Sequence, residues 1–218
     1  MYPQYSAATS GSSISEWNEV ARKNNLNINT STICCYPEDS KFIKAHTELI
    51  KKKIEGINNF KLIFSAHGLP EKNIKNGDPY QWQVEQGVKK IMEEINDINI
   101  DYILSYQSRV GPLKWIGPST EDVILENSRK GKHLVIVPIA FVSEHSETLV
   151  ELDIEYAKLA KKNGCKNYTR IEALGINHYF IEGLSDLILN KDYYKFKDNL
   201  YSPKNRCPSN FIKCPCLN

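Results

Sequence analysis

The segment His133-Leu134-Val135-Ile136-Val137-Pro138-Ile139-Ala140-Phe141 is the most apolar strand-like stretch of the chain. A helical pattern follows it from Ser146 to Asn163 and stops at Gly164. A short apolar run is typical of a strand buried on both faces, and a helix directly after it is half of a β-α-β unit. This stretch therefore predicts a parallel sheet covered by helices.

The rest of the chain repeats this alternation on both sides of that segment. Phe60 to Ala66 is a short apolar strand, and Asp78-Pro79 is a good helix start before an apolar stripe at helical spacing. The other segments are Ile28 to Cys35, Pro37 to Ile54, Asp101 to Gln107, Thr120 to Lys130, Asn167 to Leu174 and Asn177 to Asn190. The pattern predicts a Rossmann-like α/β fold, with a parallel sheet flanked by helices on both faces.

The composition is that of an ordinary soluble globular protein. Hydrophobic residues make up 41% and charged residues 25% of the 218 residues, and the mean hydropathy is -0.45. The net charge of +2 is too balanced for a general nucleic-acid binder, so we expect no nucleic-acid partner. No Gly-x-Gly-x-x-Gly follows a predicted strand, which disfavours a nucleotide site.

The sequence also bears on the relation to membranes. It has no apolar run near the roughly 18 residues that a membrane span needs, and no charged-then-apolar signal sequence at its start. We therefore expect a cytoplasmic protein. From Lys191 to Asn218, six Lys or Arg residues stand against two Asp residues. This surplus indicates either a solvated tail or a weak peripheral attraction to the anionic inner membrane.

Polar residues follow several predicted strands, at the edge where parallel sheets bind their ligands. They are His67, Gln107 to Arg109, and Ser143 to Glu151. The sequence therefore places a candidate site at the carboxyl edge of the sheet.

Three carboxylates share one line on the helix after the apolar strand. Glu147, Glu151 and Glu155 are spaced by four residues, and like charges at this spacing destabilise a helix. The row is therefore a candidate site for binding a cation. The alternative is a solvated acidic face, which Lys158, Lys161 and Lys162 could compensate.

Two histidines belong to the same edge of the sheet. His67 ends an apolar strand, and His145 lies two residues before Glu147. Two imidazoles among carboxylates can bind a divalent metal or take up protons near neutral pH. Trp115 and Phe141 lie near the same strand ends, where they belong either to the core or to the walls around a flat apolar ligand.

Four long motifs stand out along the chain: Tyr2-Pro3-Gln4-Tyr5-Ser6; Phe64-Ser65-Ala66-His67-Gly68-Leu69-Pro70; Tyr106-Gln107-Ser108-Arg109-Val110-Gly111-Pro112 with Trp115-Ile116-Gly117-Pro118; and Val137 to Leu149 with Glu151 to Tyr156. They resemble motifs of the ferrochelatase (protohaem ferro-lyase) family, which inserts ferrous iron into porphyrin, and they occur in the family's order. The resemblance covers nearly the whole chain. It implies a chelatase-type fold, protoporphyrin IX and Fe²⁺ as substrates, and protohaem as product.

The resemblance also implies roles for individual residues. His67 would face the pyrrole nitrogens, accepting a proton or helping to bind iron, and Glu147 would orient and tune its imidazole. A polar path for metal or released protons would consist of Glu144, His145, Glu151 and Glu155. Residues near the macrocycle would be Tyr2, Trp115 and Phe141, with Ser108 in the loop that contacts the porphyrin.

Members of that family are longer, with two similar half-domains that enclose a cleft. The resemblance divides this chain into a remnant of the first half-domain (1–25), one complete half-domain (26–192) and a cysteine-containing tail (193–218). A missing N-terminal half is then an expected partner, and a homodimer is compatible with the resemblance. Two alternatives stay open: a coproporphyrin ferrochelatase or an enzyme for another metal, and an inactive remnant that binds porphyrin or metal.

Three of the six cysteines lie in the tail. Cys207, Cys214 and Cys216 form C-x6-C-x-C, which suggests a soft-metal site, and iron–sulfur clusters usually take four thiolates. The spacing resembles that of ferrochelatases with a [2Fe–2S] cluster, whose fourth ligand would be Cys34 or Cys35 here. Cys165 is expected to be a lone structural thiol. The alternative is an unstructured tail with free or zinc-binding thiols.

Overall fold

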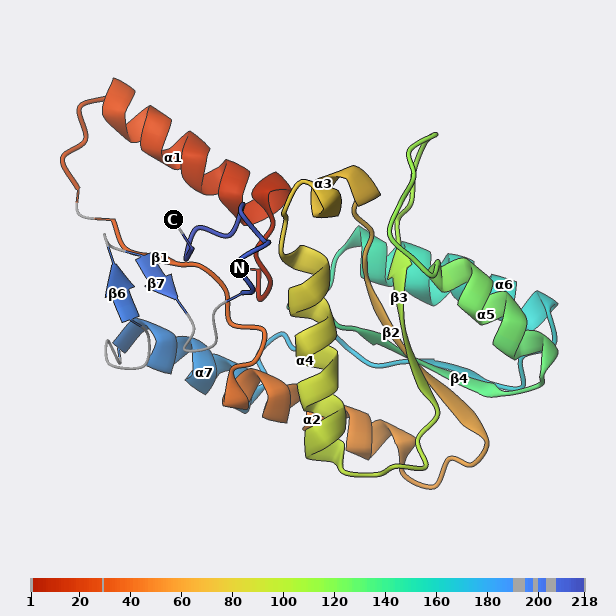
Figure 1. The fold of residues 1–218 in the computed structure, drawn as a ribbon. Helices are drawn as coiled ribbons and strands as arrows, with labels where there is room; N and C mark the ends of the chain where they lie inside the picture. The colour runs from red at the N-terminus through yellow and green to blue at the C-terminus, as the bar shows by residue number, and fades with distance from the viewer. Residues whose placement is uncertain (1, 29, 190–194, 198–199, 203–206, 218) are drawn as a thin grey trace.

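Figure 1 shows a computed structural model of the chain, which describes residues 2–28, 30–189, 195–197, 200–202 and 207–217. A parallel sheet lies at its centre. In space its strands run β3 (Tyr102–Gln107), β2 (Phe60–His67), β4 (His133–Pro138) and β5 (Tyr168–Arg170). All three neighbouring pairs are parallel. The predicted parallel sheet is confirmed.

The two faces of this sheet are buried under different helices. On β2, Leu62, Phe64 and Ala66 belong to one core cluster, whereas Ile63 belongs to the other. The first face packs against α2 (Ser40–Ile54), α4 (Tyr80–Ile95) and α7 (His178–Leu189). The second packs against α5 (Thr120–Arg129), the π-helix η2 (Glu147–Tyr156) and α6 (Ala157–Lys162). The short helix α3 (Glu71–Lys75) follows β2. The alternation along each strand places helices on both faces, as predicted.

The helix predicted from Ser146 to Asn163 differs from the α-helix that its spacing indicates. Its first ten residues, Glu147–Tyr156, form a π-helix, and only Ala157–Lys162 is α-helical. Two side chains of β5 contact this π-helix. The Tyr168 hydroxyl donates to the carbonyl of Leu152 at 2.7 Å, and Arg170 pairs with Asp153. These tertiary contacts stabilise a helix type that is rarely found in proteins.

A second, smaller sheet joins the two ends of the chain. β1 (Thr32–Ile33) pairs in parallel with β7 (Leu200–Ser202), which pairs antiparallel with β6 (Lys195–Lys197). The expectation of a strand over 28–35 in the main alternation is therefore wrong. Only two of those residues form a strand, and their partner lies in the tail.

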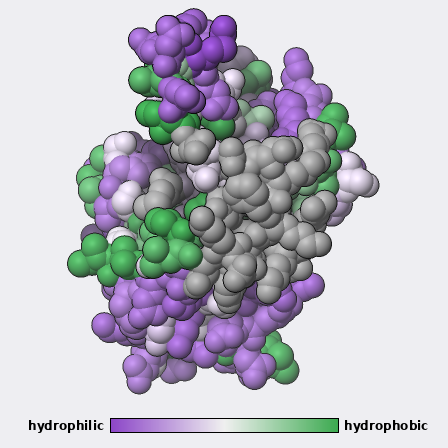
Figure 2. All heavy atoms as spheres, turned by 90° about the vertical axis from the view of Figure 1, so that its left-hand side faces the viewer, coloured by the Kyte–Doolittle hydropathy of each residue, from purple (hydrophilic) through white to green (hydrophobic). Residues whose placement is uncertain are grey.

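The N-terminal segment is anchored on the main body, whereas the helix after it projects outward. The carbonyl of Pro3 accepts a hydrogen bond from Tyr36 N at 2.8 Å. η1 (Ala7–Gly11) and α1 (Ser12–Lys23) follow, and neither contains a buried residue. Trp17 and Val20 of α1 are exposed. Figure 2 views this side of the molecule, where hydrophobic and hydrophilic side chains share the surface.

No helix in the described part of the chain is long and apolar enough to cross a membrane. Of the basic tail residues, Lys213 is described with its side chain. Lys195 and Lys197 lie in β6, of whose side chains nothing is described, and the others fall outside the described residues.

Candidate functional site

A cleft of about 440 Å³ opens at the carboxyl edge of the central sheet. Its walls come from the N-terminal segment, the end of β2, the first residue of α4 and the turn between β4 and η2. The lining residues are Tyr2, Gln4, Ser6, Thr9, His67, Gly68, Leu69, Tyr80, Ala140, Phe141, Val142, Ser143, His145 and Glu147. This is the edge at which the sequence places the site.

His67, the last residue of β2, is held in one orientation by its contacts. Its Nδ1 lies 2.7 Å from the carbonyl oxygen of Gly68, and its Nε2 lies 3.1 Å from Oε1 of Glu147. A carbonyl oxygen can only accept a hydrogen bond, so Nδ1 carries a proton and donates it. Nε2 is then the ring nitrogen that faces the Glu147 carboxylate. The Tyr80 hydroxyl donates to the carbonyl of His67 at 3.0 Å and fixes the backbone.

His145 lies on the other side of Glu147. The backbone N–H of Glu147 donates to Nδ1 of His145 at 3.3 Å, and this nitrogen lies 3.4 Å from Oε2 of Glu147. The ring packs against Phe141, with centroids 4.8 Å apart. The structure thus brings together His67, His145, Glu147 and Phe141, and Glu147 connects the two imidazoles.

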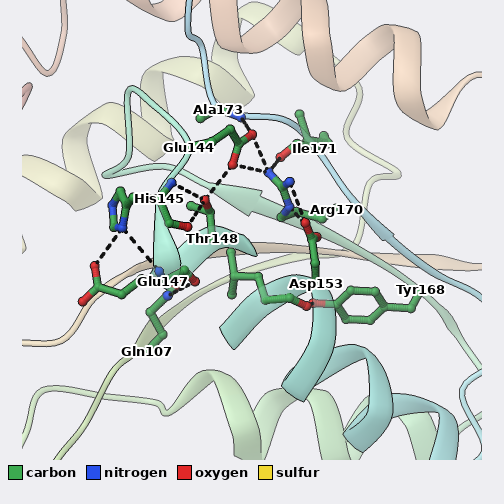
Figure 3. Close-up of polar contacts among 11 residues, drawn as sticks. Gln107, Glu144, His145, Glu147, Thr148, Asp153, Tyr168, Arg170, Ile171 and Ala173 are labelled. Carbon is green, nitrogen blue, oxygen red and sulfur yellow. Dashed lines mark hydrogen bonds and ion pairs between the residues drawn. The ribbon is translucent and has the colours of Figure 1, made fainter. Parts of the chain in front are cut away.

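Glu144 points toward Arg170 and away from Glu147, as Figure 3 shows. Its carboxylate accepts hydrogen bonds from Arg170 Nη1 at 2.8 and 3.0 Å, Thr148 Oγ1 at 2.6 Å and Ala173 N at 2.8 Å. Although burial raises its pKa, these donors hold the pKa of Glu144 below its ordinary value. Glu144 is therefore ionised and engaged with Arg170, and it does not line the cleft.

Glu151 contacts the loop after β3. Its oxygens accept from Ser108 N at 2.8 Å, Ser108 Oγ at 2.5 Å, Gln107 Nε2 at 3.1 Å and the Tyr156 hydroxyl at 2.8 Å. The two hydrogen bonds from Ser108 to Glu151 stabilise the backbone of Ser108, whose φ of 57° lies in the left-handed region. The carboxylate of Glu151 and the hydroxyl of Ser108, both predicted site residues, are thus bonded to each other. Glu155 is exposed, and the structure does not bring it to His67.

The predicted aromatic residues occupy different places. Tyr2 and Phe141 line the cleft, whereas Trp115 packs behind Gly68 and is not among the lining residues of the described chain. A Cβ atom on Gly68 would lie 2.8 Å from the carbonyl oxygen of Gln107 and 3.2 Å from the Trp115 ring, which leaves room only for glycine. The Trp115 indole N–H is buried without a hydrogen-bond partner in the part of the chain that the structure describes.

Sequence reasoning missed several residues that build the cleft. Gln4 is buried and lines it, and its Nε2 has no partner among the described residues. Asp78, predicted only as a helix cap, accepts from Ser6 Oγ and Ala7 N, both at 2.9 Å. The occurrence of Gln4 and Ser6 inside a recognisable motif was the available signal. The partnership with Asp78 left no trace in the local sequence.

Five cysteines gather on the side of α4 that bears the chain ends. The sulfurs of Cys34, Cys214 and Cys216 lie within 4.8 Å of one another. Cys207 is hydrogen-bonded to Cys214, and Cys35 to Cys34. Hydrogen bonds from Cys207 and Cys34 keep the pKa of Cys214 below its ordinary value, whereas contacts with neighbouring thiols and burial raise the pKa of Cys34, Cys35, Cys207 and Cys216. Cys214 is therefore the thiol of the cluster that ionises most readily. Cys165 lies apart and donates to the carbonyl of Asn167 at 2.9 Å.

Gln83 of α4 connects this thiol cluster to the N-terminal segment. Its Nε2 donates to the sulfurs of Cys35 and Cys207 at 3.3 and 3.2 Å. Its Oε1 accepts from the backbone N–H of Tyr5 at 2.7 Å. The thiols therefore share one buried hydrogen-bonded group with a segment that lines the cleft.

Comparison with known proteins gives consistent results. The family model described as Ferrochelatase matches residues 1–192. A protein named Ferrochelatase from Pelagibacter ubique is 72% identical over 218 residues, which cover 100% of this chain and 63% of that protein. One of the same name from Rickettsia felis is 47% identical, over 99% of this chain and 62% of that protein. The chain thus spans less than two thirds of these relatives.

A solved structure supports the fold alone. SirB from Bacillus subtilis with Fe³⁺ superposes with a TM-score of 0.54 at 17% sequence identity. The match covers 88% of this chain and 71% of that one.

Proposed function

The chain belongs to the ferrochelatase family, and on that premise we propose that it carries the proton-accepting wall of a site where Fe²⁺ enters protoporphyrin IX to form protohaem. Metallation of a porphyrin releases two pyrrole protons, so the site needs bases that face the ring nitrogens. The observation that carries the proposal is the pairing of His67 Nε2 with Glu147 at 3.1 Å on the wall of the cleft.

The geometry around His67 supports a proton-accepting role. Because Nδ1 is engaged with the carbonyl of Gly68, Nε2 is the nitrogen that can take a pyrrole proton. The Glu147 carboxylate stabilises the imidazolium that results. His145, in contact with the other oxygen of Glu147, gives the proton a way outward. Each pyrrole N–H bond that breaks leaves its electron pair on the nitrogen, which binds the incoming Fe²⁺.

The walls of the cleft suit a flat macrocycle. Leu69, Ala140, Phe141 and Val142 supply apolar surface, and Tyr2 adds a half-exposed ring. Gln4 offers a buried amide without a protein partner in the described chain. Glu151 and Glu155 remain in the proposal as outer members of a metal or proton path. Glu151 is hydrogen-bonded to the loop that carries Ser108, and Glu155 is exposed to solvent.

We propose that a further segment, corresponding to the part of the relatives that this chain does not span, completes the cleft. The partly exposed apolar side chains of α1, Trp17 and Val20, support this proposal, because 43% and 39% of their surface stays accessible in the described chain. We also propose a peripheral contact with a membrane. The loop after β3 exposes Val110 and Leu113, and these apolar side chains together with the basic residues of the tail support such a contact.

The thiol cluster fits a [2Fe–2S] group in its donor chemistry. Such a cluster takes four thiolates, and five buried or half-buried cysteines meet here: Cys34, Cys35, Cys207, Cys214 and Cys216. When bound, the cluster would supply a redox-sensitive crosslink between the tail and the segment before α2. Anaerobically purified protein should then be reddish-brown with about two iron and two sulfide per chain. Colourless protein that contains zinc would contradict this.

The function is tested by anaerobic insertion of Fe²⁺ into protoporphyrin, measured by haem absorbance. The chain is assayed alone and together with the N-terminal part of the Pelagibacter relative. We expect insertion by the combination, and weak porphyrin binding by the chain alone. His67→Ala should abolish insertion while the fold is kept. Activity that survives this change, or faster reaction with coproporphyrin, would contradict the proposal.

A further inference from the structure

Arg170 is the centre of the largest ion-pair network drawn in Figure 3. Its Nε and Nη2 donate to the two oxygens of Asp153 at 2.6 and 2.8 Å, and its Nη1 donates to both oxygens of Glu144. The side chain is only 11% exposed. One guanidinium thus holds two carboxylates with paired, charge-assisted hydrogen bonds.

The two carboxylates bracket the segment that carries the reacting groups. Glu144 lies just before η2 and Asp153 lies within it, so His145 and Glu147 stand between two points fixed to β5. Thr148 tightens the first turn. Its hydroxyl donates to Glu144 at 2.6 Å and accepts from His145 N at 3.0 Å. The place of Glu147 relative to His67 therefore depends on contacts that lie outside the cleft.

Without Arg170 the two carboxylates would face each other with no cation between them. Glu147 and Glu151 on the same helix add further negative charge nearby. Mutual repulsion would then push the turn and the π-helix away from β5. Because η2 is a π-helix supported by contacts from β5, it has little local stability with which to resist that movement.

We infer that Arg170 is a positioning residue for the iron-insertion site: through Glu144 and Asp153 it sets Glu147 against His67, and Glu144 serves this clamp rather than the metal path. The inference rests on the proposed role of the His67–Glu147 pair. It predicts the same defect from Arg170→Gln and Glu144→Gln, because each removes one side of one contact. If Glu144 were instead a metal ligand, loss of Arg170 would free its carboxylate, and the two changes would have opposite effects on iron affinity.

The first test is nitrogen-15 NMR of the histidine rings in the full chain. Glu147→Gln defines the ring-nitrogen shifts of a His67 that has lost its partner. Arg170→Gln and Glu144→Gln should move the His67 signals toward that reference, and the double variant should add little. Arg170→Lys keeps the positive charge but lacks the paired donors of the planar guanidinium, so it should restore the wild-type His67 signals only in part. The matched control is Lys61→Gln, because the ion pair of Lys61 with Asp101 is also shielded but lies at the opposite end of the sheet.

The second test uses whichever preparation inserts iron. Both single variants should lower kcat on the order of 10- to 100-fold, with little change in KM for Fe²⁺. Unchanged His67 signals in Arg170→Gln, equal shifts in Lys61→Gln, or opposite changes in KM for Fe²⁺ would overturn the inference. The NMR result does not require turnover. If the NMR shifts appear but no preparation inserts iron, the positioning role of Arg170 stands and the proposed function is contradicted.

Discussion

The side-chain carbonyl of Gln83 accepts a hydrogen bond from the backbone of Tyr5 at 2.7 Å, across 78 residues of sequence. The amide nitrogen of the same side chain donates to the sulfurs of Cys35 and Cys207. One glutamine on α4 thus joins a segment of the cleft wall to the thiol cluster.

Two substitutions of Gln83 separate these contacts. Gln83→Leu leaves the buried N–H of Tyr5 without an acceptor, which should destabilise the protein by about 1–3 kcal/mol in urea denaturation. Gln83→Glu keeps an acceptor for Tyr5 but cannot donate to sulfur when ionised. It should therefore change the reactivity of Cys207 toward a thiol reagent more than it changes stability. Gln81→Leu, a half-exposed site on the same helix, is the control; an equal loss there would contradict the assignment.

The carboxylates on η2 should differ sharply in their effect on turnover. Glu147→Gln removes the charge beside His67 Nε2 and should lower kcat on the order of 100-fold or more. Glu155→Gln changes an exposed carboxylate and should have little effect. Steady-state kinetics of the two variants at the same pH decide the point. Equal losses would mean that the acidic residues act through their summed field.

Gly68 should tolerate no side chain. A Cβ atom there would lie 2.8 Å from the carbonyl of Gln107 and 3.2 Å from the Trp115 ring. Gly68→Ala should therefore cost about 1–3 kcal/mol in unfolding free energy and displace the neighbouring His67. At Gly117 the nearest atom would be 3.8 Å away, so Gly117→Ala serves as the matched control. If Gly68→Ala is as stable as the wild type, Gln107 and Trp115 must move aside without cost, which would contradict this prediction.

Stability should fall in mild acid because of His46. Burial lowers the pKa of His46 from 6.5 to about 3, and neither ring nitrogen has a hydrogen-bond partner among the described residues. Below about pH 6.5 the unfolded chain binds a proton that the folded chain does not, so stability decreases as pH falls from 6.5 toward 3. At pH 5 this loss amounts to about 2 kcal/mol.

The effect of His46 can be measured by urea denaturation at pH 8 and pH 5. His46→Leu should remove that share of the acid loss, whereas His178→Gln should retain it. An unchanged pH dependence in His46→Leu would place the sensitivity elsewhere.

The central sheet was largely predictable because its strands are apolar runs between clear helix signals. Phe60 to Ala66 was predicted as a strand, and the structure extends it by one residue, to His67. The small sheet was not predictable. Strands of two and three residues carry no periodicity, and the partner of Thr32 lies in the tail.

The site was predictable only in part, for a related reason. Its position follows from the topology, since parallel strands bring His67 and the start of η2 to one edge. The partners of individual carboxylates do not follow. Glu144 and Glu147 look alike in sequence, yet Arg170 from β5 engages the first and His67 from β2 the second. Such choices depend on side chains that meet only after the sheet has formed.

The thiol cluster also dictates an order of assembly. Cys34 and Cys214 are separated by about 180 residues, so their contact closes a far longer loop than any pairing within the central sheet. During synthesis the sheet can form while residues 207–216 are still inside the ribosome, but the cluster cannot. A chain without residues 207–216 would keep His67, His145 and Glu147 of the cleft and lose three of the five thiols. The thiol cluster therefore forms after the central sheet, because it requires residues 207–216 as well as Cys34.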